Sequence, residues 1–191
     1  MPNNIQEALQ LIEERVAHDK SKGYWMVRTD DGRNYSTFVE NNFVALNVLD
    51  LPTAFLHRIV EEYQSVSSRI SQIREYILQL HSNGTINLAN RNGDVEASSV
   101  SRLAKQIYSL CFGMKCGDIV IIPDKGANRL CIGRIADEQL AVDRNLNGHF
   151  TLVRQVEWIK EIRKSRLDPC LYKALGAHQA VCDISRYAEY I

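Results

Sequence analysis

The stretch CGDIVIIPDKGANRLCIGRI, residues 116–135, decides how the chain is expected to fold. Its run 118–122 is rich in β-branched residues and lies between Gly117 and Pro123, a pattern typical of a buried strand. The segment 124–129 contains Asp, Gly and Asn, which favour a turn, and 130–135 is apolar again. This stretch therefore predicts two neighbouring core strands joined by a tight turn.

Further strands are predicted on both sides of this pair. Each is a short apolar or alternating run bounded by turn residues, and the runs lie at 24–28, 43–48, around 139–143, 150–159 and 179–185. Between the first two, residues 30–33 predict a turn and 35–39 a short helical turn, and a second short helix is predicted at 169–175. Because strands occur at both ends, we expect both ends to build the same sheet in one α+β domain, residues 1–191.

The middle of the chain is predicted to be helical. An apolar stripe with spacings of three and four residues favours one long helix, or two broken near the serines at 65–68; it comprises Phe55, Ile59, Tyr63, Val66, Ile70, Ile73, Ile77 and Leu80. This stripe would either pack on the body of the domain, which is more common, or join a second copy in a homodimer. Short helices are also predicted at 5–16 and from about 98 to 114, the latter capped by Ser98 or Ser99.

Composition restricts the classes of protein to which the chain could belong. Its 23 basic and 23 acidic residues cancel, so no global charge demands nucleic acid, although the segment 154–173 is locally basic. No stretch is long and apolar enough to span a bilayer and the N-terminus has no signal pattern, which predicts a cytoplasmic protein without membrane contact. The five cysteines have no metal-binding spacing, so we expect free thiols, no metal and no cofactor.

Three blocks carry a resemblance to a known family. They are YWMVRTDDGRNYSTFVENNFVALN (24–47), CGDIVIIPDKGANRLCIGRI (116–135) and VRQVEWIKEIRKSRLDPCLYKALG (153–176). In this order they resemble the N-terminal domain that precedes the nuclease in many Mrr-type restriction endonucleases and related defence proteins. That domain is similar to the PUA/EVE superfamily, which implies a small β-barrel with flanking helices around a flipped or unpaired base. The segment 53–97 lies outside the resemblance and would be a helical insert.

A base-reading site needs an aromatic slot and hydrogen-bonding groups at the base edge. The base-binding candidates are Trp25, Arg28, Tyr35, Phe38, Asn42, Asn47 and Trp158. Positive side chains that could hold the phosphates are Lys125, Arg129, Arg154, Arg163 and Lys164. The alternatives are core packing for each aromatic residue and a solvated hairpin tip for the charges.

Motifs for catalysis are not found in the sequence. A restriction-type nuclease needs an acidic residue and then Asp/Glu-x-Lys, but Glu157 to Lys160 and Glu161 to Lys164 each have one residue too many. Phosphate-loop, nucleophile-elbow and zinc-protease motifs are also missing. We therefore expect a protein without an active site of its own.

Together these patterns predict a non-catalytic recognition module for nucleic acid in a restriction or anti-phage defence system. Its target would be a modified base, in DNA rather than RNA, and it would act with a nuclease in the same chain or in a partner. Two alternatives remain open: an oligomerisation subunit that uses the 55–80 stripe, and a sensor of a free nucleotide signal.

Overall fold

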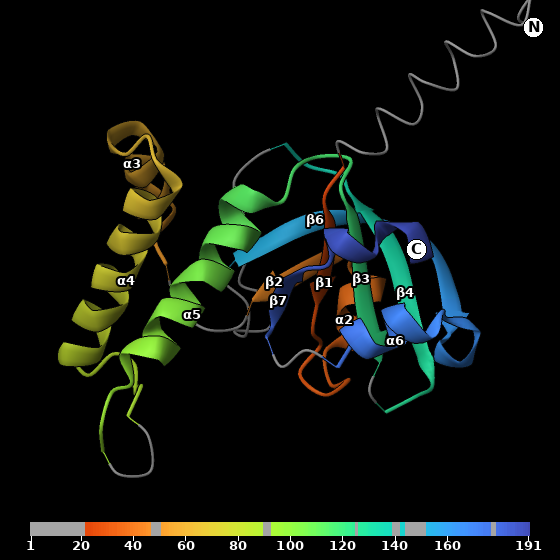
Figure 1. Cartoon of the computed structure of the whole chain (residues 1–191). Helices are drawn as coiled ribbons and strands as arrows, with labels where there is room; N and C mark the ends of the chain where they lie inside the picture. Colours follow the sequence, from red (N-terminus) through yellow and green to blue (C-terminus); the bar gives the residue numbers. More distant parts are fainter. Residues whose placement is uncertain are drawn as a thin grey trace, which may run out of the picture.

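The computed structural model describes residues 22–46, 51–89, 93–124, 126–138, 142–143, 152–176 and 179–191, and it has a mixed α+β fold. Six strands form a curled sheet in the order β2-β6-β4-β3-β1-β7, and β5 pairs with β6 (Figure 1). The strands are β1 (Tyr24–Val27), β2 (Phe43–Leu46), β3 (Ile119–Asp124), β4 (Arg129–Ile135), β5 (Val142–Asp143), β6 (Leu152–Arg163) and β7 (Val181–Asp183). The helices are α2 (Tyr35–Glu40), α3 (Thr53–Glu62), α4 (Val66–Ser82), α5 (Ala97–Tyr108) and α6 (Pro169–Ala174). The helix predicted at 5–16 lies outside the described residues.

Both ends of the chain contribute to this sheet, as the sequence predicts. Strand β1 pairs in parallel with β3 on one side and antiparallel with β7 on the other. The β3–β4 hairpin of the opening stretch is confirmed, with Asp124 opposite Arg129 at its tip. The N-terminal strand thus lies inside the sheet, between strands from the middle and the end of the chain.

The long strand β6 gives the sheet its curl. Its residues 152–155 pair with β2, whereas 156–163 pair with β4 across a bulge at Ile132/Gly133. A bulge bends the strand and increases its twist. The sequence predicts a strand at 150–159, but pairing continues to Arg163 because β4 supplies partners that the charged side chains do not reveal.

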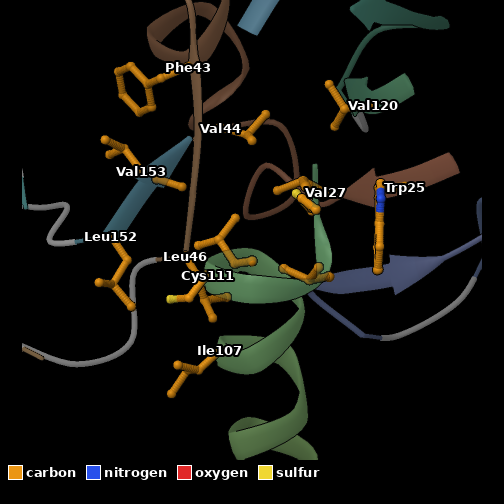
Figure 2. Packing of buried hydrophobic residues seen from close by; sticks show 14 of the residues in the cluster. Trp25, Val27, Phe43, Val44, Leu46, Ile107, Cys111, Val120, Leu152 and Val153 are labelled. Carbon is orange, nitrogen blue, oxygen red and sulfur yellow. The ribbon is translucent and has the colours of Figure 1, made fainter. Parts of the chain in front are cut away.

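Hydrophobic clusters cover the two faces of the sheet. Trp25 and Val27 point into the larger cluster, together with Ile107 of α5 and residues of β2 and β6 (Figure 2). Met26, between them in sequence, points to the opposite face, where it packs near Leu171 of α6. Alternation along a strand produces this division, and α5 and α6 therefore lie on opposite faces.

The central helices pack within the chain. Helix α3 ends at Glu62, and α4 begins at Val66 with the Ser65 hydroxyl accepting the Ser68 N–H, so of the two alternatives the pair of helices broken near the serines is the one observed. Helix α4 packs along α5 (Figure 1), and the stripe residues Ile59, Ile73 and Ile77 are buried. The buried part of the stripe thus follows the core-facing alternative, whereas Val66, at the start of α4, is exposed.

Helix α5 begins and ends differently from the prediction. It begins at Ala97 with Glu96 at the cap position, so Ser98 and Ser99 lie in its first turn and neither is the cap. The Ser99 hydroxyl instead donates to the Glu96 carboxylate. At its other end α5 continues as a π-helical turn, η1 (Ser109–Gly113), a form that is often found at functional sites. Among the described helices, none has the length and apolar character to cross a bilayer.

Candidate functional site

Trp25, the first aromatic candidate, is a core residue. Its side chain is only 8% exposed, and its indole Nε1–H donates to Asp118 Oδ2 at 2.8 Å. The same carboxylate accepts the backbone N–H groups of Gly23 and Lys115 at 2.8 and 3.0 Å. A ring that is enclosed and hydrogen-bonded in this way offers no free face to a base. Through Asp118, Trp25 instead anchors the loop that begins at Lys115.

The other aromatic candidates lie together where α2 runs beside β6. The Tyr35 hydroxyl donates to Glu161 Oε2 at 2.8 Å, and the Trp158 Nε1–H donates to the Phe38 carbonyl at 3.2 Å. Tyr35 and Phe38 are buried, whereas Trp158 is half-buried. Gly133 makes room for Trp158, since a Cβ there would lie 2.7 Å from its ring. The structure therefore brings these three residues together as the packing between α2 and the sheet.

Arg129, predicted to hold phosphate, is instead engaged with carboxylates. It pairs with Asp124 at 2.9 Å and Glu161 at 3.2 Å, and its guanidinium lies 4.8 Å from the centre of the Tyr35 ring. Burial and the hydrogen bond to Glu161 raise the pKa of Tyr35 far above its ordinary value. These contacts neutralise the Arg129 charge at the position where a phosphate would need it.

Lys164 and Arg163 follow at the end of β6. The Lys164 ammonium donates to the carbonyls of Asp124 and Ala127 and so ties down the hairpin tip, and burial lowers the pKa of Lys164. Arg163 is exposed and makes no ion pair with any residue that the structure describes. Of the predicted phosphate ligands on this surface, Arg163 is the one most open to solvent. Lys125 lies outside the described residues.

Arg154 lies in the interior rather than on the basic surface expected from the sequence. It is 1% exposed and pairs with Asp137 at 2.7 Å. Its Nη1 donates to the carbonyls of Leu110 and Met114 at 3.2 and 2.6 Å, and its Nη2 to the Asp137 carbonyl at 2.9 Å. A guanidinium satisfies C-terminal helix carbonyls well in both charge and geometry. Arg154 therefore fixes the π-helical turn to β6.

The remaining edge-reading candidates lie at turns. Arg28 is partly exposed and contacts Asp31 at 3.5 Å. Asn42 is exposed with a φ of 55°, in the left-handed region that asparagine tolerates, and its carbonyl accepts the Val156 N–H at 2.9 Å. It is a turn residue between α2 and β2. Asn47 lies outside the described residues.

A cleft of about 420 Å³ opens between the central helices and the π-helical turn. Its apolar lining includes Val60 of α3, Phe112 of η1 and Met114. Its charged residues are Arg69 of α4, Lys115, Glu138 and, at the buried end, Arg154. Of the predicted site residues that the structure describes, only Arg154 lines this cleft. The other residues that line the cleft come from three separate segments, and no local sequence pattern places them together.

This cleft combines the groups that small-ligand sites use. Concave apolar walls with a few polar groups typically hold organic ligands, and the volume lies in the usual range for such sites. The Glu138 carboxylate can accept hydrogen bonds, while Arg69 and Lys115 can donate to an anion. Cys111 also lines the cleft, but burial raises the pKa of its thiol to about 12, which keeps it protonated and unreactive.

Metal binding finds no support in the described part of the chain, where no three His, Cys, Asp or Glu side chains gather closely enough to hold an ion. No family model, curated protein or solved structure matches the chain. The role of the cleft is therefore inferred from its own geometry and chemistry.

Proposed function

We propose that the chain is a non-catalytic recognition module that holds one nucleotide unit of a nucleic acid in the cleft beside the π-helical turn. The observation that carries the proposal is the combination of Phe112 and Met114 with Arg69, Lys115 and Glu138 around one cavity of about 420 Å³. A nucleotide outside a duplex presents an aromatic face, a hydrogen-bonding edge and a phosphate, and these groups match that lining.

Each part of the lining has a role in this proposal. Phe112 is half-buried, with its ring 5.5 Å from that of Tyr108, and it offers an aromatic surface on which a base can stack. The Glu138 carboxylate accepts hydrogen bonds from an exocyclic amino group, the feature that marks cytosine, adenine or guanine. Arg154 keeps the floor of the cleft rigid through its four hydrogen bonds to Asp137, Leu110 and Met114.

The family resemblance supports a role in restriction or anti-phage defence. Its three blocks supply β1, β3, β4 and most of β6, which are neighbours in the one sheet that supports the cleft. A PUA/EVE-like recognition domain would direct a nuclease, in the same chain or in a partner, to DNA that carries a modified base. The cleft, rather than Trp25, is the site that we assign to that base.

Binding of oligonucleotides by the whole chain tests this function. Fluorescence anisotropy would compare single- and double-stranded DNA and RNA, with and without modified cytosine or adenine, at two salt concentrations. We expect micromolar or tighter binding to at least one DNA at low salt and weaker binding at high salt, because phosphate contacts release counterions. Phe112→Ala should weaken binding by about 1–3 kcal/mol if its ring stacks on a base.

Tyr172→Ala is the matched control, because Tyr172 is 57% exposed on α6, on the other face of the sheet. It should bind like the wild type, and circular dichroism should show both variants folded. The proposal fails if no oligonucleotide binds at low salt, or if the two variants lose equal affinity. Binding of mononucleotides without binding of any oligonucleotide would point to the second candidate, a sensor of a free nucleotide, which the same cleft could serve.

A further inference from the structure

The helical segment 53–97, outside the family resemblance, supplies one wall of the cleft. Val60 of α3 and Arg69 of α4 lie on that wall, and Lys115, on the loop after the π-helical turn, lines the same cleft. From this arrangement we infer that Arg69 and Lys115 form a phosphate subsite. The inference rests on the proposed nucleotide-binding role of the cleft, and it assigns the anion contact to Arg69 of the helical insert and to Lys115 rather than to the basic segment 154–173.

Arg69 is held in place before any ligand arrives. Its Nε–H donates to the Tyr63 carbonyl at 2.7 Å and its Nη2 to the Val60 carbonyl at 3.4 Å. These carbonyls belong to the C-terminal end of α3, where a positive charge is favoured. Within the described part of the chain, Nη1 makes no hydrogen bond, so its two N–H groups are available to an oxygen anion in the cleft. A guanidinium fixed in this way loses little entropy on binding.

Lys115 is fixed through its backbone and free at its side chain. Its N–H donates to Asp118 Oδ2 at 3.0 Å, on the same carboxylate that Trp25 holds. The side chain is exposed at the mouth of the cleft and pairs with no carboxylate that the structure describes. An ammonium on a flexible stem can follow the phosphate that Arg69 orients.

The other charges in the cleft compensate these two cations only in part. Arg154 is neutralised by Asp137, with which it forms a buried pair. Among the described residues that line the cleft, Glu138 is then the one carboxylate, against the two positive side chains of Arg69 and Lys115. The lining therefore has a net charge of about +1, which suits a phosphate monoester or diester more than a neutral nucleoside.

Affinity for a deoxynucleoside and for its 5′-monophosphate, measured by calorimetry on the whole chain for each of the four bases, tests the subsite. In the wild type the monophosphate should bind at least about tenfold more tightly than the nucleoside. Arg69→Gln should reduce this ratio toward one and leave the affinity for the nucleoside unchanged. Arg74→Gln is the matched control, because Arg74 is exposed on the same helix and does not line the cleft.

Arg69→Gln also removes the hydrogen bonds at the end of α3, so Lys115→Gln serves as a second variant without that structural role. A reduced ratio in both variants supports the subsite. An unchanged ratio in both overturns it, even where oligonucleotides bind, and so does a wild type that binds no monophosphate. Monophosphate binding that depends on Arg69, without binding of any oligonucleotide, supports the subsite while the proposed nucleic-acid function fails.

Discussion

At the scale of single residues, the polar partner of a side chain decides its role more than its type does. Trp25, Arg129 and Arg154 are residue types that nucleic-acid sites use, but each is bound to a carboxylate of its own chain. Buried polar groups must find such partners, because leaving one unsatisfied costs about 1–3 kcal/mol. The sequence shows which side chain can donate a hydrogen bond, but it does not show which acceptor binds that donor in the folded protein.

Trp25→Ala should destabilise the fold rather than impair binding alone. The change removes a large buried ring and leaves the Asp118 carboxylate without one of its three donors, so we expect a loss of about 3–5 kcal/mol in the free energy of unfolding. Urea denaturation followed by circular dichroism would measure it. A stable variant that has lost only its ligand affinity would place Trp25 in the binding site after all.

Asp124 should make stability depend on pH in the acid range. Burial acts to raise the pKa of its carboxyl, but the Arg129 guanidinium and the N–H groups of Ala127 and Gly126 outweigh this, so the net pKa is lowered. Because the folded pKa lies below the unfolded value of about 3.9, the stabilisation is complete above that value. It is lost as the pH falls through the folded pKa.

Urea midpoints measured between pH 6 and pH 2 would show this decline in the wild type. Asp124→Asn should be less stable near neutral pH and should show a flatter dependence on acid. Parallel curves for the two proteins would mean that Asp124 contributes nothing to the acid transition.

At the scale of elements, the sequence predicts strands and helices well and their partners less well. The hairpin 119–135, the break at Ser65 and the short helix α6 all follow from turn residues, caps and periodicity. The parallel pairing of β1 with β3 does not, because contacts between residues about 95 positions apart leave no local pattern. The final third of β6 is also not predicted from the sequence, because its charged residues do not show the alternation of a strand.

Gly133 lies beside the bulge between β4 and β6, where there is no room for a side chain. A Cβ there would lie 2.4 Å from Val156 Cγ1 and 2.7 Å from the Trp158 ring, so Gly133→Ala should destabilise the fold by about 1–3 kcal/mol through overpacking. Gly126→Ala, at the hairpin tip, meets one atom at 3.6 Å and should be nearly neutral. Thermal unfolding of the two variants tests this contrast, and equal melting temperatures would contradict it.

At the scale of the whole molecule, the cleft forms between segments that no sequence pattern relates to one another. Arg69, Phe112 and Lys115 come from α4, the π-helical turn and the following loop, and they become neighbours only when α4 packs on α5. For this reason the sequence predicts Arg154 as a site residue but not the other residues that line the cleft. A π-helical turn that follows a strongly amphipathic helix is not marked by any residue pattern that we can identify.

Ile73 tests whether the apolar stripe holds the chain's own core together. It is fully buried, so Ile73→Ala should cost about 2–5 kcal/mol in the free energy of unfolding without changing the mass in solution. Val66→Ala, at a stripe position that is 54% exposed, should have little effect. Urea denaturation and light scattering measure the two properties. A change in mass without a loss of stability would make the stripe an interface between copies.

The position of β1 inside the sheet also has a consequence for how the protein folds. Its neighbours β3 and β7 lie about 95 and 160 residues further along the chain, so neither can pair with it until those residues have been synthesised. Such distant contacts slow folding, because the loop between them must close before any pairing energy is gained. During synthesis β1 therefore remains unpaired until its partner strands have been made. Chaperones that shield exposed strand edges should increase the yield of native protein.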